Sequence, residues 1–162
     1  MLSERTWHER QLLGDLEAEI SAGAVALIED AVPLYEKLLE VFPHRAARID
    51  WGRVPGAVHL DGPPERATSN FQLREPATEL REFWGRVRLT YNIGNETEVI
   101  VLGDGLVSFA LRLRVKILTD HLVDILSIPQ HTYVVPVDFS WCFHYTVEDE
   151  AYWGVAPTDF QR

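Results

Sequence analysis

The sequence predicts an α+β fold in which N-terminal helices pack on a mostly antiparallel sheet of about six strands. Apolar residues recur at helical spacing in the first part of the chain, and they alternate with polar residues in the second half, where turn signals separate short runs. The chain has 162 residues, of which 46% are hydrophobic and 25% charged, as in an ordinary soluble domain. We therefore expect one domain over residues 1–162, with 1–45 mainly helical and 86–156 forming the sheet around one inserted short helix.

The first third contains two helical patterns. The first follows Ser3, an expected N-cap, and its apolar positions are Leu12, Leu13, Leu16 and Ile20. The apolar run 24–28 is too short to separate strand from helix by pattern, and we assign it to helix. A further helix is expected to begin between Asp30 and Pro33 and to end at Pro43.

The middle of the chain has weaker patterns. Short strands are expected at 48–54 and 57–60, followed by a polar, turn-rich loop at 61–70. Residues 77–84 place Leu80, Phe83 and Trp84 at helical spacing, so a helix is expected to pack there on the sheet.

The second half predicts a meander of strands at 87–93, 97–101, 107–117, 132–137, 139–147 and 151–155, with a short helix over 119–126. The run 107–117 also fits a helix. Its unbroken alternation and the preceding Asp104–Gly105 turn favour a strand. In that strand Arg112, Arg114 and Lys116 share one face, and we expect them to pair with Glu96 and Glu98 across the sheet.

The charge limits the class of partner. Twenty-five acidic and 15 basic side chains give a formal charge of −10, which repels nucleic acid and anionic membrane surfaces. The charge then serves either solubility or a basic protein partner. No apolar run approaches the roughly 20 residues of a membrane span, and one cysteine cannot form an internal disulfide. A cytoplasmic protein is the expectation.

Histidines offer one candidate site. His131, His144 and Asp138 lie in the second half, and imidazole with carboxylate suits a hydrolase-like or metal site. Their spacing matches no metal or catalytic motif, so each histidine is more simply a structural or surface imidazole. Cys142, set between two aromatic residues, is expected to be a buried and unreactive thiol. We therefore predict no catalytic residues, metal or cofactor, and keep His131, His144 and Asp138 as the alternative.

Aromatic residues are dense near the end of the chain. They are Tyr133, Phe139, Trp141, Phe143, Tyr145, Tyr152 and Trp153. They either form the main core or leave a binding patch beside the acidic turn, because Trp and Tyr dominate interface hot spots and carboxylates steer a cationic partner. The residues predicted to bind a partner are Glu148, Asp149, Glu150, Tyr152 and Trp153. The same exposed aromatics would alternatively form a homodimer contact.

Four runs in the second half resemble small bacterial α+β proteins, some of them similar to immunity proteins of polymorphic-toxin systems. The runs are 103–106, 128–134, 139–143 and 148–154. The resemblance implies a small, cytoplasmic, non-catalytic protein that neutralises a toxin by covering its active site. The expected function is accordingly a protein-binding module, an immunity-type antagonist of a basic partner. The alternatives are an enzyme with the His131 and His144 site, and a structural or homodimerising protein.

Overall fold

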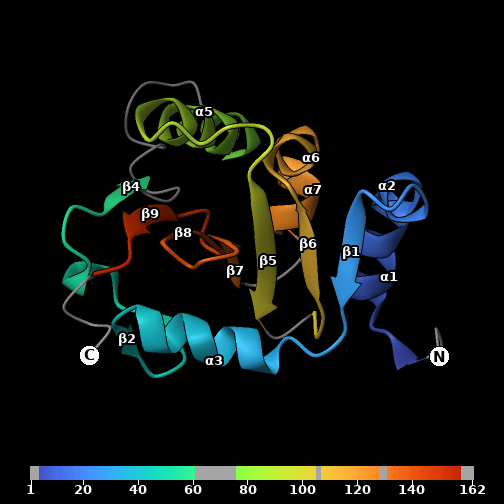
Figure 1. The fold of residues 1–162 in the computed structure, drawn as a ribbon, viewed down its shortest axis with the longest axis horizontal. Helices are drawn as coiled ribbons and strands as arrows, with labels where there is room; N and C mark the ends of the chain where they lie inside the picture. Colours follow the sequence, from blue (N-terminus) through green and yellow to red (C-terminus); the bar gives the residue numbers. More distant parts are fainter. Residues whose placement is uncertain (1–3, 61–75, 105–106, 128–130, 158–162) are drawn as a thin grey trace.

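The computed structural model describes residues 4–60, 76–104, 107–127 and 131–157, and within them seven strands form one antiparallel sheet. The strand order is β1-β6-β5-β7-β8-β9-β4 (Figure 1). The strands are β1 (Val25–Ile28), β4 (Val58–Leu60), β5 (Glu98–Asp104), β6 (Ala110–Arg114), β7 (His131–Pro136), β8 (Trp141–Thr146) and β9 (Ala151–Val155). A separate hairpin joins β2 (His44–Arg45) to β3 (Arg48–Ile49). The predicted α+β class is confirmed.

Helices cover both faces of the large sheet. One face packs against α1 (Trp7–Asp15), α5 (Pro76–Thr90), α6 (Val115–Asp120) and α7 (Leu122–Ser127), and α2 (Glu17–Ser21) follows α1 beside β1. The opposite face packs against α3 (Val32–Val41) and the segment after it, which includes the short 3-10 helix η2 (Trp51–Arg53). Figure 1 shows α3 crossing the sheet on the side away from α5.

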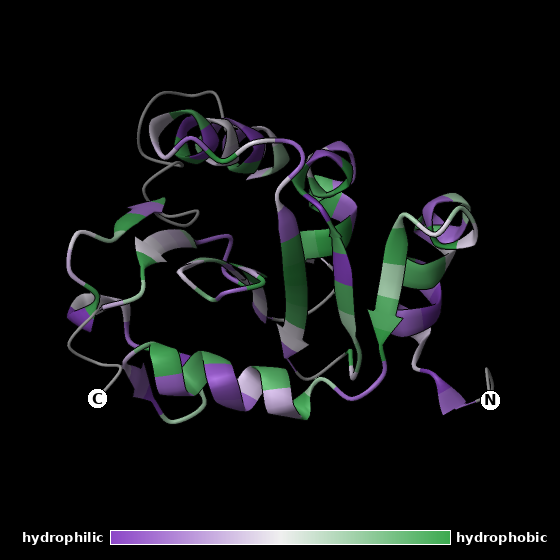
Figure 2. Ribbon diagram, viewed as in Figure 1, coloured by the Kyte–Doolittle hydropathy of each residue, from purple (hydrophilic) through white to green (hydrophobic). Residues whose placement is uncertain are grey.

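The central strands are apolar on both faces because both are covered. In β5, Val99 and Val101 belong to the core under α5 and α7, whereas Ile100 and Leu102 belong to the core under α3. Figure 2 shows this continuous hydrophobic character along β5. A strand buried on both faces needs an apolar run, and not only alternation.

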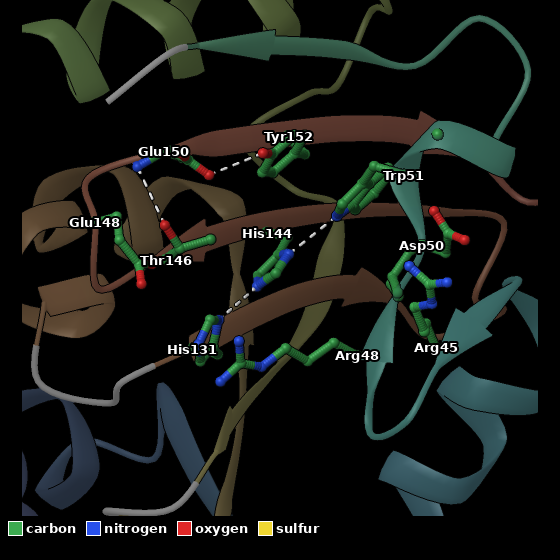
Figure 3. A pocket seen from close by; sticks show the side chains of 12 residues that line it. Arg45, Arg48, Asp50, Trp51, His131, His144, Thr146, Glu148, Glu150 and Tyr152 are labelled. Carbon is green, nitrogen blue, oxygen red and sulfur yellow. Dashed lines mark hydrogen bonds between the residues drawn. The ribbon is translucent and has the colours of Figure 1, made fainter. Parts of the chain in front are cut away.

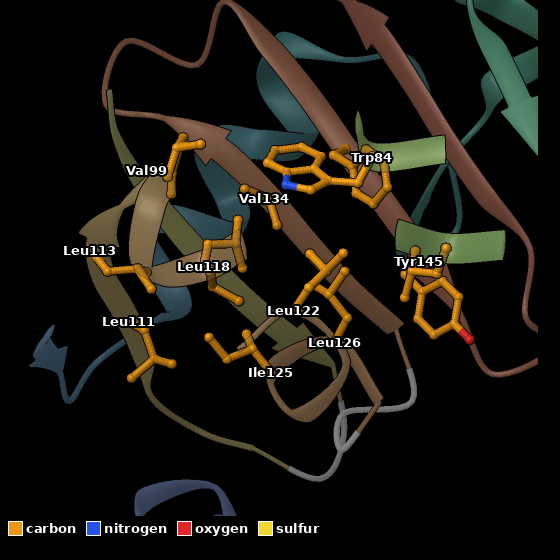
Figure 4. Packing of buried hydrophobic residues seen from close by; sticks show 14 of the residues in the cluster. Trp84, Val99, Leu111, Leu113, Leu118, Leu122, Ile125, Leu126, Val134 and Tyr145 are labelled. Atoms are coloured by element: carbon orange, nitrogen blue, oxygen red, sulfur yellow. The ribbon is translucent and has the colours of Figure 1, made fainter. Parts of the chain in front are cut away.

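The larger core surrounds Trp84 (Figure 4). Trp84 is 1% exposed, its ring meets Phe143 edge-on with centroids 4.9 Å apart, and its Nε1–H donates to the Thr119 hydroxyl at 3.0 Å. The buried indole therefore satisfies its polar atom while it joins α5 to the sheet and to α6.

The N-cap of α1 is Thr6, whereas Ser3, the expected N-cap, lies outside the described residues. Thr6 and Glu9 form a capping box, in which each side chain accepts the other's backbone N–H. Glu9 also accepts from the backbone N–H and the hydroxyl of Ser108 at 2.8 and 2.7 Å. The buried carboxylate thus joins α1 to the chain that leads into β6.

Two element predictions, at 24–28 and at 87–93, are wrong. Residues 24–28 contain strand β1, which pairs with β6. The expected strand at 87–93 belongs largely to α5, which runs to Thr90, and Leu89 is 86% exposed, so the alternation there was not that of a half-buried strand. After α5 the chain therefore returns to the sheet only at Glu98. The shared cause is that short apolar runs fit both periods.

The expected strand 107–117 exists only as β6, and α6 begins at Val115. The backbone N–H of Val115 donates to the Thr97 carbonyl, and that of Lys116 donates to the Asn95 carbonyl, so the chain leaves the sheet there. Arg112 and Arg114 pair with Glu98 and Glu96 at 2.8 and 3.0 Å as predicted. Lys116 instead pairs with Asp120 within α6. Two short helices, α6 and α7, stand where one was expected.

Between Pro43 and Leu60 the expected strands are shorter. The first is reduced to β3 and followed by η2, and β4 covers 58–60 at the sheet edge. The loop predicted at 61–70 lies outside the described residues. The segment 42–57 crosses over β8 and β9, where Gly154 lies directly beneath it.

A side chain at Gly154 would collide with this segment. A Cβ atom there would lie 2.8 Å from Val54 Cγ1 and 3.0 Å from the Trp51 ring. We expect Gly154→Ala to lower the free energy of unfolding by about 1–3 kcal/mol, measured by urea denaturation, because the segment must shift. Gly85→Ala is the control: Gly85 lies within α5 with open space around it, so a gain of about 1 kcal/mol is expected. Equal stability of Gly154→Ala and wild type would contradict the close approach.

Candidate functional site

A cleft of about 590 Å³ opens on the α3 side of the sheet, between the β2–β3–η2 segment and the ends of β7, β8 and β9 (Figure 3). Its size is that of a small-molecule site or of a pocket for a partner's side chains. Its lining residues are Arg45, Arg48, Ile49, Asp50, Trp51, Gly52, His131, His144, Thr146, Glu148, Glu150 and Tyr152.

A row of rings crosses four strands beside the cleft, and two of them, His144 and Tyr152, line it. Tyr133, His144, Tyr152 and His59 face one another in register from β7 to β4. Tyr133 stacks on His144 with centroids 4.2 Å apart, and the remaining neighbours lie about 6 Å apart, at 6.0 and 6.1 Å. Such cross-strand ring pairs stabilise a sheet through contact of their faces.

Trp51 lies over this row. Its ring is parallel to that of Tyr152 within 5°, with centroids 5.6 Å apart, and it is also stacked on His144. The indole Nε1–H donates to His144 Nδ1 at 3.0 Å. The η2 segment is therefore attached to the sheet by both packing and a directional hydrogen bond.

The indole determines the protonation state of two imidazoles. Indole nitrogen can only donate, so His144 Nδ1 must be the acceptor and His144 carries its proton on Nε2. His144 Nε2 lies 3.1 Å from His131 Nδ1, which accepts a hydrogen bond from the His144 Nε2–H group. His131 must then carry its own proton on Nε2. The hydrogen bonds from Trp51 to His144 and from His144 to His131 keep both imidazoles neutral. They also make the Nε2–H group of each imidazole a hydrogen-bond donor.

Burial has the same effect on their charge. Both imidazoles are 3% exposed. Burial lowers the pKa of His144 to about 3, with a further contribution from His131. The pKa of His131 is lowered by burial and by the Arg48 guanidinium, while Asp104 and Glu148 oppose that shift. Neutral imidazoles are the charge state that this environment favours.

The acidic turn between β8 and β9 forms one rim of the cleft. The Thr146 and Glu150 backbones close a three-residue turn, in which Asp149 takes a left-handed conformation (φ 61°) and accepts a hydrogen bond from the Tyr145 hydroxyl. Glu150 accepts from the Tyr152 hydroxyl at 2.9 Å. Glu148 is exposed, and it makes no ion pair within the described ranges.

The predicted partner-binding residues separate into two groups. Glu148, Glu150 and Tyr152 line the cleft together. Asp149 instead holds the turn, and Trp153 is 3% exposed in the core on the other face, stacked on Tyr91. Because neighbouring strand residues point to opposite faces, Tyr152 and Trp153 do not share a surface.

The predicted aromatic patch is not an exposed surface. Five of its seven members are at most 7% exposed, and Trp141 and Tyr152 are half-buried. Trp141, Phe143 and Tyr145 face the larger core as expected, whereas Phe139 lies in the β7–β8 turn with a positive φ of 58° and packs in the smaller core. The alternative of a mainly core role for these residues holds.

The alternative histidine site is assembled in part. His131 and His144 are in direct contact, whereas Asp138 lies in the turn at the opposite end of the β7–β8 hairpin, where it accepts from the backbone N–H of Ser140. Across the residues that the structure describes, no group of three or more His, Cys, Asp or Glu side chains has the geometry of a metal site. Cys142 is fully buried, and burial raises the pKa of its thiol well above the ordinary value.

Sequence reasoning missed Trp51, Arg45 and Arg48. Arg48 and Trp51 were assigned to an ordinary strand over 48–54, and Arg45 lay before it. No local pattern indicates that η2 folds over β8. A tryptophan beside glycine and between charged residues, in Asp50–Arg53, was the one available signal.

Comparison with known protein families and with curated proteins found no match. The resemblance of the second half to immunity-type proteins therefore stays a prediction. In the described ranges, none of the helices has both the length and the apolar character that crossing a membrane requires.

The hydrogen-bond chain predicts the tautomers of both imidazoles. Nitrogen-15 correlation spectra at neutral pH should show His131 and His144 neutral and protonated on Nε2, because the indole donates to His144 Nδ1. A proton on Nδ1 of either ring would contradict this arrangement. His44, which is exposed and outside the cleft, is the internal reference for an ordinary solvent-accessible imidazole.

The lowered pKa values also predict a loss of stability in acid. An imidazole in the unfolded chain takes up a proton near pH 6.5, whereas folded His144 does so only near pH 3. The contribution of neutral His144 to the free energy of unfolding is therefore fully present above pH 6.5, and it is lost as the pH falls from 6.5 toward 3. Between pH 7 and pH 4 we expect a decrease of up to about 3 kcal/mol in the free energy of unfolding from His144.

The matched measurement is urea denaturation of wild type and His144→Phe across the same pH range. The lowered pKa values of Glu9 and Asp138 act alike in both proteins, so the difference in pH dependence reports the imidazole pair. Identical pH dependence would show that His144 is not held neutral.

Proposed function

We propose that this chain is a non-catalytic protein-binding module, an immunity-type antagonist that receives a cationic side chain of a basic partner in the cleft. The observation that carries the proposal is the position of Glu148, an exposed carboxylate without an ion pair in the described ranges, on the rim of a cleft floored by Tyr152 and Trp51. A lysine or arginine side chain entering there meets a carboxylate that attracts its charge, beside aromatic rings that its methylene groups can contact.

The overall charge supports a basic partner. A formal charge of −10 accelerates the encounter with a cationic surface, and carboxylates at the rim orient it. Arg45 and Arg48 lie on the opposite side of the cleft from Glu148 and Glu150 (Figure 3). Asp50 also lines the cleft beside Arg45, so that side carries both signs, whereas Glu148 and Glu150 give the other rim negative charge that attracts a cation.

The state of the histidines supports binding over catalysis. A general base needs a free lone pair near the reacting proton. The Nδ1 lone pairs of both His144 and His131 already accept hydrogen bonds, and their Nε2 atoms carry protons. The one observation in favour of the enzyme alternative is the contact between the two rings. With these hydrogen bonds in place, neither imidazole has a free lone pair with which to act as a general base.

Charge reversal at the rim tests the proposal. A basic polypeptide that co-purifies at fixed stoichiometry is to be identified by native mass spectrometry, and its association rate measured by surface plasmon resonance. We expect Glu148→Lys to slow association at least tenfold at low ionic strength and less at high ionic strength, because screening removes the steering.

The control is Glu17→Lys, an exposed acidic residue on α2 at the far end of the sheet, which should leave the rate within about twofold. The proposal would be overturned by a partner whose association rate changes neither with Glu148→Lys nor with ionic strength.

A further inference from the structure

A hydrogen-bond donor faces the cleft and has no partner among the protein groups that the structure describes. His131 is 3% exposed and lines the cleft, and its Nδ1 is occupied by His144. Its Nε2 carries the proton and has no hydrogen-bond partner among the residues that the structure describes. An N–H that points into a cleft and is held in one orientation is available to an acceptor atom of a ligand, which exchanges with solvent there.

A guanidinium lies beside this donor. Arg48 extends from β3 toward His131 in Figure 3, and its charge is close enough to lower the pKa of that imidazole. Within the described part of the chain neither Arg48 nor Arg45, which also lines the cleft, forms an ion pair. An uncharged acceptor would satisfy His131 alone, whereas an anionic acceptor satisfies both groups.

We propose that the His131 and Arg48 end of the cleft is an oxyanion-binding site for a carboxylate or phosphate group. One oxygen of the anion accepts from His131 Nε2–H and another from the Arg48 guanidinium. Charge-assisted hydrogen bonds of this kind are the stronger class in proteins. Glu148 and Asp104 also act electrostatically on His131, in the opposite sense to Arg48, so the two donors must outweigh their repulsion of an anion. The site does not depend on a basic partner, because its donors are His131 and Arg48 and not the acidic rim.

The hydrogen bonds that run from Trp51 through His144 to His131 make the site specific for hydrogen-bond acceptors. If His144 could turn or change tautomer, His131 Nε2 would sometimes present a lone pair and repel an anion. The indole removes that freedom. The donor is thus set before any ligand arrives, which reduces the cost of ordering the site on binding.

The experiment follows the His131 Nε2–H resonance during titration with sodium phosphate and, separately, sodium acetate, at constant ionic strength kept with sodium chloride. We expect saturable shifts in the millimolar range, typical of a small anion on few contacts. Saturation by phosphate alone would assign the site to phosphoryl groups, and saturation by acetate as well would assign it to carboxylates too.

Two variants locate the binding. Arg48→Gln removes an exposed charge and should raise the dissociation constant about tenfold while the protein stays folded. Arg53→Gln is the matched control, an exposed arginine of η2 outside the cleft lining, and should leave the constant unchanged. The proposal is overturned if neither anion shifts the His131 resonance, or if both variants weaken binding equally. A basic partner that fails to bind would leave these titrations unaffected, so the two proposals fail separately.

Discussion

The packing of Trp51 against the sheet is the interaction on which the cleft depends. Its ring covers Tyr152 and His144, Gly154 leaves the space for it, and its N–H sets the proton positions of two imidazoles. One side chain therefore fixes the position of the segment that carries Arg45 and Arg48, and it also fixes the chemical character of His131. The geometry of the cleft and its electrostatics have a common origin.

The cleft combines two charge environments that the fold keeps apart. Glu148 and Glu150 come from the β8–β9 turn, whereas Arg45 and Arg48 come from the β2–β3 hairpin. Separate elements hold them, so the opposite charges do not neutralise one another within the described residues. A cationic group of a partner and an oxyanion can each find a complementary side, with the aromatic floor between them.

The alternation of apolar and polar residues predicted the fold class because the sheet has many strands, and because turns separate β7, β8 and β9 along the chain. The sequence also predicted that Cys142 is buried, as the structure has it. The errors at 24–28, 87–93 and 115–117 arose where a short apolar run fits two periods, and where the decision came from distant partners such as β6 for β1. Local sequence does not carry that information.

The site was less accessible to sequence reasoning. The acidic turn and Tyr152 were found from composition, and the contact of His131 with His144 was considered only as an alternative. Trp153 was placed with Tyr152 although strand alternation separates them. The decisive residue, Trp51, lies 93 positions from the histidine it contacts.

Trp51→Phe tests the central claim most directly, because it keeps an aromatic ring over Tyr152 and removes the N–H that sets the chain. Without that donor His144 is free to carry its proton on Nδ1, and His131 Nε2 can then present a lone pair to the cleft. We expect the folded variant, checked by its thermal unfolding, to bind phosphate about tenfold more weakly although Arg48 is intact. Unchanged phosphate affinity, with both rings still protonated on Nε2, would contradict the account.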